Sequence, residues 1–308
     1  RNLTGGRLMI EIKNLTKKYD GKVAVEHLSL SVSDGDIYGF IGANGAGKTS
    51  FIRIINQITK PDSGEIFIND KPLEINHIRE VGYMPEERGL YKNMTIGDQL
   101  MYFGELKGMS KNDILAESKH WFEKLEIDQW WKKKLSELSK GMAQKIQFVV
   151  TVLHRPKLLI LDEPFSGFDP VNANLIKDQI LDLKAQGTTI ILSTHRMESV
   201  EELCDSVALV HQSRKVLDGR ISEVKEKFKQ NLFEITLSEA SLEAFNSFKT
   251  KNELFNEKQD ENLIRFEIKN SMSQRELLQE LLNIGKIVEF KEKIPTMNEV
   301  FIAAVKGI

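Results

Sequence analysis

The sequence predicts an α/β fold built on a mostly parallel sheet, followed by a smaller α+β domain. Short continuous apolar runs at residues 158–161 and 188–193 alternate with helical patterns, which is typical of buried parallel strands joined by helices. A glycine-rich segment at 42–50 stands between a strand pattern and a helix pattern. Beyond about residue 222 the pattern changes to short strands and amphipathic helices. A chain of 308 residues has room for two such domains.

The N-terminal part predicts antiparallel strands. In residues 9–13 and 28–33, apolar and polar side chains alternate, which gives each strand one buried face. Asp20-Gly21 is a pair typical of a tight hairpin turn between these strands. Residues 37–41 then predict a short buried strand that ends in glycines.

The middle of the chain alternates helices with short strands. We expect a helix over 49–58, a strand over 65–69, and a mostly helical stretch over 95–154. Two further helices are expected on either side of the 188–193 strand, at 173–185 and 197–204.

The C-terminal part predicts a small α+β domain. Strands are expected at 232–237, 263–268 and 286–290, and helices at 239–248 and 273–284. The Lys- and Glu-rich stretch that precedes the first of these strands is interpreted as a linker.

Composition excludes several classes of protein. Hydrophobic residues make up 41% and charged residues 29%, which is an ordinary balance for a folded chain. Forty-three basic residues against 45 acidic ones give a net charge of −2, which disfavours a nucleic-acid partner. Cys204 is the single cysteine, so no intramolecular disulfide can form. No apolar run approaches the ~20 residues of a membrane span, and no signal peptide is evident, so we expect a cytoplasmic protein. We expect residues 1–8 to be a cloning remnant or a short extension.

Residues 42–50 read GANGAGKTS and fit G-x-x-x-x-G-K-[ST], the phosphate loop. Glycines allow several backbone N–H groups to point at one anion, and the N-terminus of the following helix adds partial positive charge. Lys48 supplies a full charge to the β- and γ-phosphates of a nucleotide, and the Thr49 hydroxyl can bind Mg²⁺. The alternative is a glycine-rich turn that merely contains a lysine. The predicted nucleotide-binding residues in this loop are Gly42, Asn44, Gly45, Ala46, Gly47, Lys48, Thr49 and Ser50.

Two carboxylates follow the apolar run at 158–161. Ligands of open α/β sheets bind at the carboxyl ends of strands, where Asp162 and Glu163 are placed. We expect Asp162 to hold Mg²⁺ and Glu163 to act as a general base on the attacking water. The pair alone would also fit a solvated strand end, but the phosphate loop requires such an acid.

At this point the chain resembles the ATP-binding-cassette (ABC) ATPases. Residues 138–142 (LSKGM) are similar to the family's LSGGQ signature, with Lys and Met substituted, and 166–170 (SGFDP) to its D-loop. His195 matches the switch histidine, and Tyr19 lies where the family stacks an aromatic ring on adenine. The resemblance covers about residues 9–221. It implies a P-loop NTPase cassette with a mostly parallel core sheet, an antiparallel β subdomain and a helical subdomain at about 89–154, followed by an accessory domain at 222–308.

The resemblance also implies site roles. Glu163 and His195 would be catalytic, and Asp169 would couple two sites. The signature residues Leu138, Ser139, Lys140, Gly141 and Met142 would bind the ATP of a second copy.

One departure concerns Glu86, which stands where the family usually has a metal-binding glutamine. A carboxylate can still reach the metal or its water. The string PEERGLY at 85–91 and the tail at 294–301 are similar to the ATPases of ABC-2-type sodium and drug exporters.

The resemblance implies a transport-coupled ATP hydrolase with ATP and Mg²⁺ as ligands. It would form a head-to-tail homodimer on binding ATP and lie on the inner face of the cell membrane, held there by ABC-2-type permease subunits. The groove around residues 86–91 is the expected docking site. Residues 130–134 (WWKKK) are interpreted as a solvated basic helix end, with a contact to partner or lipid headgroups as the alternative.

Two other functions belong to the same superfamily. A nucleic-acid or ribosome-associated ATPase is disfavoured, because the chain has one phosphate loop and no coiled-coil insertion between Lys48 and Asp162. A binding-only cassette is ranked last, because Glu163 and His195 are both present.

Overall fold

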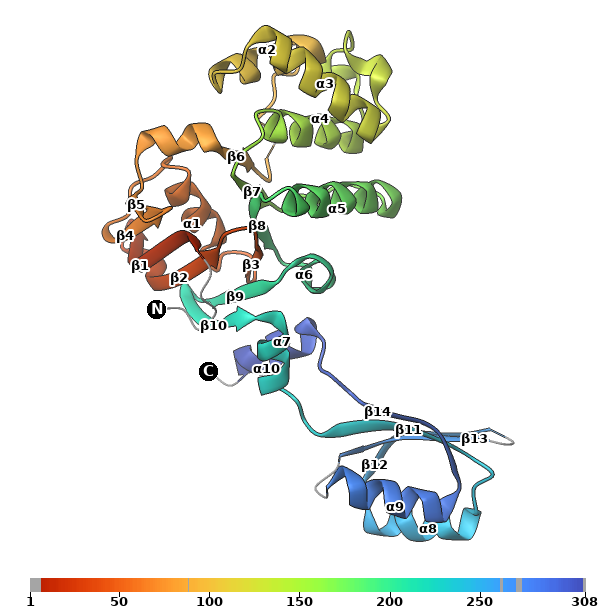
Figure 1. Cartoon of the computed structure of the whole chain (residues 1–308). Coiled ribbons are helices and arrows are strands. Elements are labelled where there is room, and N and C mark those ends of the chain that lie inside the picture. Colours follow the sequence, from red (N-terminus) through yellow and green to blue (C-terminus); the bar gives the residue numbers. More distant parts are fainter. Residues whose placement is uncertain (1–6, 88, 261–262, 270–272, 307–308) are drawn as a thin grey trace. The chain divides into compact units, whose positions relative to one another are not determined.

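The computed structural model describes residues 7–87, 89–260, 263–269 and 273–306. Two compact units are resolved by their internal contacts, one extending to Ile221 and the other comprising Ser222–Lys306 (Figure 1). Most of the predicted extension at 1–8 and Arg88 of the predicted docking segment lie outside the described residues.

An antiparallel sheet opens the first unit. Its order is β2-β1-β4-β5. The turn between β1 and β2 contains only Asp20 and Gly21, both with positive φ, as the hairpin prediction requires. β1 begins one residue before the predicted start, inside the segment expected to be an extension. The strands are β1 (Leu8–Tyr19), β2 (Lys22–Ser33), β4 (Ser63–Ile68) and β5 (Lys71–Pro72).

The core sheet has six strands in the order β10-β9-β3-β8-β7-β6, and all neighbours are parallel except β10 with β9. The predicted mostly parallel sheet is therefore confirmed. β9 and β10 are not among the predicted strands. The strands are β3 (Ile37–Ile41), β6 (Val81–Met84), β7 (Leu158–Asp162), β8 (Thr189–Thr194), β9 (Ser206–His211) and β10 (Arg214–Arg220).

Both faces of the core sheet are covered, which explains its continuous apolar strands. Figure 1 shows α1 (Lys48–Ile55) on the side that faces the antiparallel sheet and α5 (Pro170–Ala185) on the other. Side chains of β7 alternate between the two faces. Leu158 and Ile160 pack in the core on the α1 side, and Leu159 and Leu161 pack in the core on the α5 side. A short helix, α6 (Met197–Leu203), follows β8.

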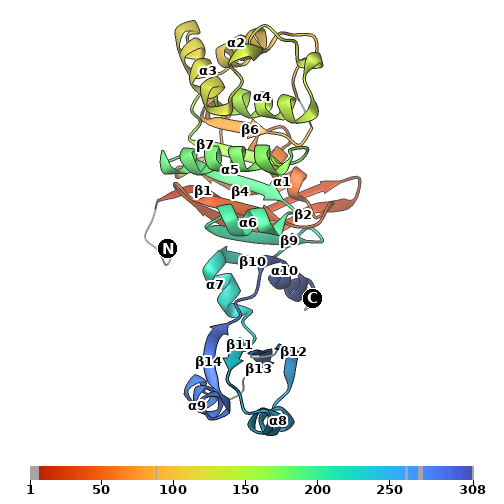
Figure 2. The same cartoon turned by 90° about the vertical axis from the view of Figure 1, so that its right-hand side faces the viewer.

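The predicted helical stretch forms three helices, α2 (Ile96–Leu106), α3 (Lys111–Leu125) and α4 (Lys140–Val152), which lie together in Figure 2. Short 3₁₀ turns stand at Ile75–Glu80, Asp128–Trp130 and Leu135–Glu137. Within the described residues, no helix combines the length and apolar character that a membrane crossing requires.

The two adjacent tryptophans pack inside this helical region. A Cβ on Gly97 would lie 2.4 Å from the indole of Trp131, so α2 and this loop touch closely. Trp130 also packs on the apolar core, whereas the lysines at 132–134 are exposed. Packing therefore accounts for the tryptophans, while the exposed lysines leave the choice between a solvated basic end and a contact with partner or lipid headgroups untested.

The second unit has the order β-α-β-β-α-β with sheet order β12-β13-β11-β14, all antiparallel, which is a ferredoxin-like topology. The two helices that stand between its strands, α8 (Leu242–Lys251) and α9 (Gln274–Ile284), lie on one face of the sheet (Figure 1). The expected linker contains a helix, α7, and β12 and α10 are elements that the sequence does not predict. The elements are α7 (Ile221–Lys227), β11 (Leu232–Ser238), α8 (Leu242–Lys251), β12 (Leu254–Asp260), β13 (Leu263–Lys269), α9 (Gln274–Ile284), β14 (Lys286–Glu292) and α10 (Met297–Lys306).

His154, in the turn after α4, makes the first unit sensitive to acid. Its Nε2 lies 3.2 Å from the Val81 carbonyl, and burial, aided by the charge of Lys107, lowers the pKa of His154 to about 4. In the unfolded chain, this histidine takes up its proton near pH 6.5. Between pH 6.5 and about pH 4, the unfolded chain therefore binds more protons than the folded chain, and the free energy of unfolding decreases as the pH falls.

We expect this one group to cost about 1.4 kcal/mol per pH unit over that range, or about 3 kcal/mol by pH 4. Urea unfolding at a series of pH values should therefore give a shallower acid slope for His154→Gln than for the wild type. Replacing the exposed His120 in the same way should leave the slope unchanged. Equal slopes for wild type and His154→Gln would contradict the assignment.

Candidate active site

The loop after β3 is shaped by two glycines that no other residue could replace without strain. Gly47 has φ = 109°, and a Cβ there would lie 2.1 Å from the Ala24 carbonyl oxygen. A Cβ on Gly42 would lie 2.3 Å from the Val210 carbonyl oxygen. Gly47 also precedes the first residue of α1, so the loop ends at a helix N-terminus, as a phosphate site requires.

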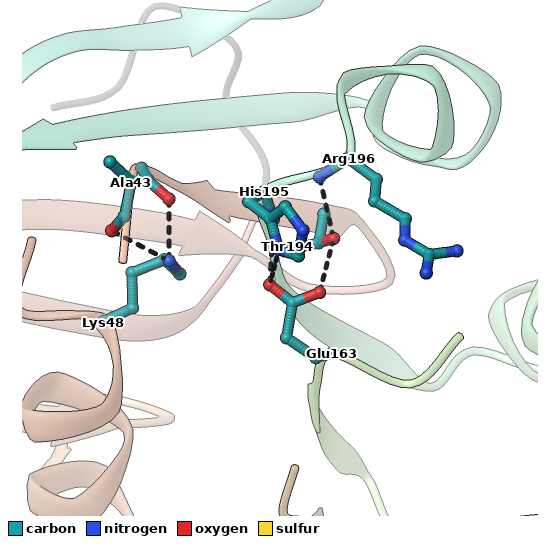
Figure 3. A network of polar contacts seen from close by, with 7 residues as sticks. Ala43, Lys48, Glu163, Thr194, His195 and Arg196 are labelled. Carbon is teal, nitrogen blue, oxygen red and sulfur yellow. Dashed lines mark hydrogen bonds and ion pairs between the residues drawn. The ribbon is translucent and has the colours of Figure 1, made fainter. Parts of the chain in front are cut away.

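Lys48 is held inside this loop. Its side chain is buried, and Nζ donates to the carbonyl oxygens of Gly42 at 2.7 Å and Ala43 at 3.2 Å (Figure 3). Burial lowers the pKa of Lys48, while the nearby carboxylates of Glu163, Asp162 and Glu86 act in the opposite direction. Among the described residues, the hydrogen-bond partners of this cation are two neutral carbonyl oxygens, which an anion can replace.

A cavity of about 400 Å³ opens in front of the loop. Predicted site residues that lie far apart in the sequence line this cavity. Three residues that were not predicted also line it: Lys22, Val23 and Ala24. These three residues follow the Asp20-Gly21 turn, and they reach the cavity because the β1–β2 hairpin reverses the chain there. Only this hairpin could have indicated them from the sequence. The predicted residues Gly42, Ala46 and His195 do not line the cavity. The predicted residues that line it are Tyr19, Asn44, Gly45, Gly47, Lys48, Thr49, Ser50, Glu86, Asp162 and Glu163.

Asp162 and Glu163 stand at the carboxyl end of β7, and both are less than a tenth exposed. Burial raises the pKa of Asp162, and the charges of Glu86 and Glu163 raise it further against the opposing charge of Lys48. Glu163 has φ = 49°, a left-handed conformation that non-glycine residues seldom adopt. The backbone is thus turned at this residue, where the strand ends and the carboxylate lines the cavity.

The Glu163 carboxylate accepts hydrogen bonds on both oxygens (Figure 3). Oε1 accepts from the backbone N–H of His195 at 3.0 Å and lies 2.6 Å from its Nδ1, and Oε2 accepts from the Thr194 hydroxyl at 3.1 Å. His195 is therefore adjacent to the predicted base. Thr194 is a neighbour of the base for which the sequence motif gives no role.

The two segments expected to act on a second copy do not line the cavity. Ser139 caps α4 by accepting from the N–H of Met142 at 3.3 Å, and Asp169 caps α5 by accepting from the N–H of Asn172 at 3.0 Å. Leu138, Lys140 and Gly141 belong to the same α4 start. A Cβ on Gly141 would lie 3.6 Å from the Gly167 carbonyl, so the signature segment and the D-loop adjoin each other.

The donor set around Lys48 suits a hard cation. Thr49, Asp162 and Glu86 offer only oxygen ligands, which Mg²⁺ prefers, and all three line the same cavity. Within the described part of the chain, no cluster of three His, Cys, Asp or Glu is arranged as a metal cage. Mg²⁺ commonly uses one or two carboxylates with substrate phosphates and water, so this set fits that mode.

Comparisons with protein families place three domain descriptions on the chain. The family model "ABC transporter" matches residues 25–166. The model "ATP-binding protein DrrA1-3-like, C-terminal domain" matches 219–305, and a further model, "AAA domain, putative AbiEii toxin, Type IV TA system", matches 133–201.

Individual proteins agree with this. The chain is 38% identical over 302 residues to an uncharacterized ABC transporter ATP-binding protein of Bacillus subtilis, covering 97% of this chain and 99% of that one. It is 34% identical to the bacitracin transport ATP-binding protein of Bacillus licheniformis, covering 73% of this chain and 74% of that one. A solved structure described as an ATP binding subunit of an ABC transporter superimposes with a TM-score of 0.67 at 30% identity, covering 71% of this chain and 93% of that one.

Proposed function

The chain belongs to the ATP-binding subunits of ABC transporters, and from this membership we propose that it is the ATP-hydrolysing subunit of an ABC-2-type exporter. The observation that carries the proposal is the single cavity that brings Lys48, Asp162 and Glu163 together. The export assignment is supported by relatives whose names specify Nod factor export and bacitracin transport.

In the proposed site, the loop N–H groups and Lys48 bind the phosphates of ATP, and the exposed ring of Tyr19 stacks on adenine. Thr49, Asp162 and Glu86 would hold Mg²⁺, which supplies positive charge to the phosphate oxygens. Glu163 takes a proton from the water that attacks the γ-phosphorus, the bond from that phosphorus to the bridging oxygen breaks, and ADP and phosphate leave. His195 senses the γ-phosphate.

We further propose that ATP closes a head-to-tail homodimer. Ser139 and the N–H of Gly141 lie at a helix start away from the cavity of their own chain, so a second copy could present them to the γ-phosphate. Moving an equilibrium from 1:99 to 99:1 needs about 5.5 kcal/mol. A few charge-assisted hydrogen bonds of about 1.5–3 kcal/mol, made twice in a symmetric dimer, suffice. Asp169, beside the signature segment, would couple the two sites.

A second cavity, of about 450 Å³, is the proposed docking groove for the permease. Its walls include Ile78, Val81, Leu90, Phe103, Leu106 and Val150. Of the expected docking segment 86–91, Gly89 and Leu90 line this groove, but Glu86 lines the nucleotide cavity. A groove is therefore present beside this segment, as expected, and its role in docking the permease is the proposal. Leu106 is 62% exposed, so a partner seated in the groove could bury its side chain.

The docking proposal is tested by purifying tagged chain from detergent-solubilised membranes of the cells that make it, and identifying what accompanies it by mass spectrometry. We expect an ABC-2-type permease with the wild type and its loss with Leu106→Asp. Leu115→Asp, at an exposed leucine of α3 outside the groove, should retain it. Equal recovery with both variants would remove the groove from docking. Recovery of ribosomal proteins in place of a permease would favour the non-transport function.

A further inference from the structure

Thr194, the last residue of β8, connects the backbone of the switch segment to the Glu163 carboxylate. Its side chain is fully buried. Its Oγ1 accepts from the N–H of Arg196 at 3.1 Å and donates to Glu163 Oε2 at 3.1 Å (Figure 3). A hydroxyl has one hydrogen to donate and lone pairs to accept with. It therefore accepts from the N–H of Arg196 and donates its hydrogen to the carboxylate, which can only accept.

The two side chains that contact the oxygens of Glu163 differ in their exposure to solvent. The His195 side chain that reaches Oε1 is 53% exposed, so a ligand can approach it from solvent. The Thr194 hydroxyl on Oε2 is fully buried, and a β-branched side chain in a strand has few rotamers available. When the His195 side chain engages a phosphate, the carboxylate therefore keeps the Thr194 hydroxyl on Oε2 and the backbone N–H of His195 on Oε1.

From this geometry we propose that Thr194 is a positioning residue for ATP hydrolysis, which keeps Glu163 oriented toward the attacking water. The inference rests on the proposed role of Glu163 as general base. Without the hydroxyl, only Oε1 remains held, by the backbone N–H and Nδ1 of His195. The carboxylate is then restrained at one oxygen instead of two, and its basic oxygen is less well aimed at the water. A misplacement of about 1 Å can cost about 100-fold in rate.

The chain contains a matched control at the other end of the same strand. Thr189 is also fully buried, and its Oγ1 accepts from the N–H of Gly35 at 2.8 Å and donates to the Asp34 carboxylate at 3.1 Å. The two threonines thus make the same pair of hydrogen bonds, but Thr189 and Asp34 do not line the nucleotide cavity. Thr189→Val and Thr194→Val remove equivalent interactions from the fold.

Steady-state hydrolysis of Mg-ATP by the full chain tests the proposal. We expect Thr194→Val to lower kcat about 10- to 100-fold with KM unchanged, and Thr194→Ser to recover most of the lost turnover. Thr189→Val should keep the wild-type kcat, although its thermal midpoint falls by about as much as that of Thr194→Val. In the Glu163→Gln background, Thr194→Val should have no further effect, since the group it positions is already disabled.

Several results would overturn the inference. These are a wild-type kcat for Thr194→Val, a Thr194→Ser variant as slow as Thr194→Val, or the same fractional loss in the Glu163→Gln background as in the wild type. The proposed function fails separately. If Glu163→Gln itself turns over ATP normally, then Glu163 is not the base, whereas an inactive Glu163→Gln beside an active Thr194→Val contradicts the positioning role alone.

Discussion

Glu163→Gln is expected to lower the turnover of Mg-ATP about 10²- to 10⁴-fold, the range that general-base catalysis contributes. Glutamine has nearly the same shape and can still accept hydrogen bonds from Thr194 and His195, but it cannot take a proton from water. The loss should therefore appear in kcat, measured as phosphate release at saturating ATP, while nucleotide affinity is retained.

Glu198→Gln provides the control for this experiment. Glu198 is an exposed acid on α6, three residues after His195, and it does not line the nucleotide cavity. Its replacement removes the same charge from the same part of the chain and should leave turnover at the wild-type rate. Wild-type turnover by Glu163→Gln would remove Glu163 from its proposed role.

Lys48→Ala is expected to weaken nucleotide binding about 10- to 100-fold, because a hydrogen bond to a charged group contributes about 1.5–3 kcal/mol. Its ammonium now bonds the carbonyls of Gly42 and Ala43, which are uncharged acceptors that a phosphate can replace. Turnover should fall further than affinity, because the same charge also stabilises the transition state. Titration with a fluorescent ATP analogue measures the affinity directly.

Lys60→Ala is the matched variant for Lys48→Ala. Lys60 is an exposed lysine of the same unit outside the nucleotide cavity, so its removal changes the net charge equally without touching the loop. If both variants bound the analogue as tightly as the wild type, the loop would not be the phosphate site.

Much of the candidate nucleotide site was predictable because its signals are local. Residues 42–50 contain the complete phosphate loop, and the apolar run that ends at Asp162 identifies a buried strand without any knowledge of its neighbours. The strand pairs Ile41↔Thr194 and Asp162↔Ser193 then place the loop, the acids and the switch segment at the same edge of the sheet. Placement of ligands at the carboxyl ends of strands is a general property of such sheets.

The rest depends on contacts that no short segment encodes. The hydrogen bond between Thr194 and Glu163 joins residues 31 positions apart, and a threonine at a strand end has many other possible partners. Lys22 and Ala24 reach the cavity only because the β1–β2 hairpin folds over the loop. β12 was not predicted because it is an edge strand with mostly exposed, charged or polar residues, so it lacks a buried alternating face.

The proposed cycle depends on ATP joining two copies of the chain, and light scattering of Glu163→Gln at saturating Mg-ATP tests this most directly. Because this variant binds ATP without hydrolysing it, we predict a particle with twice the mass of one chain, which separates when nucleotide is removed. A particle with the mass of a single chain, at nucleotide concentrations where binding is saturated, would contradict the account.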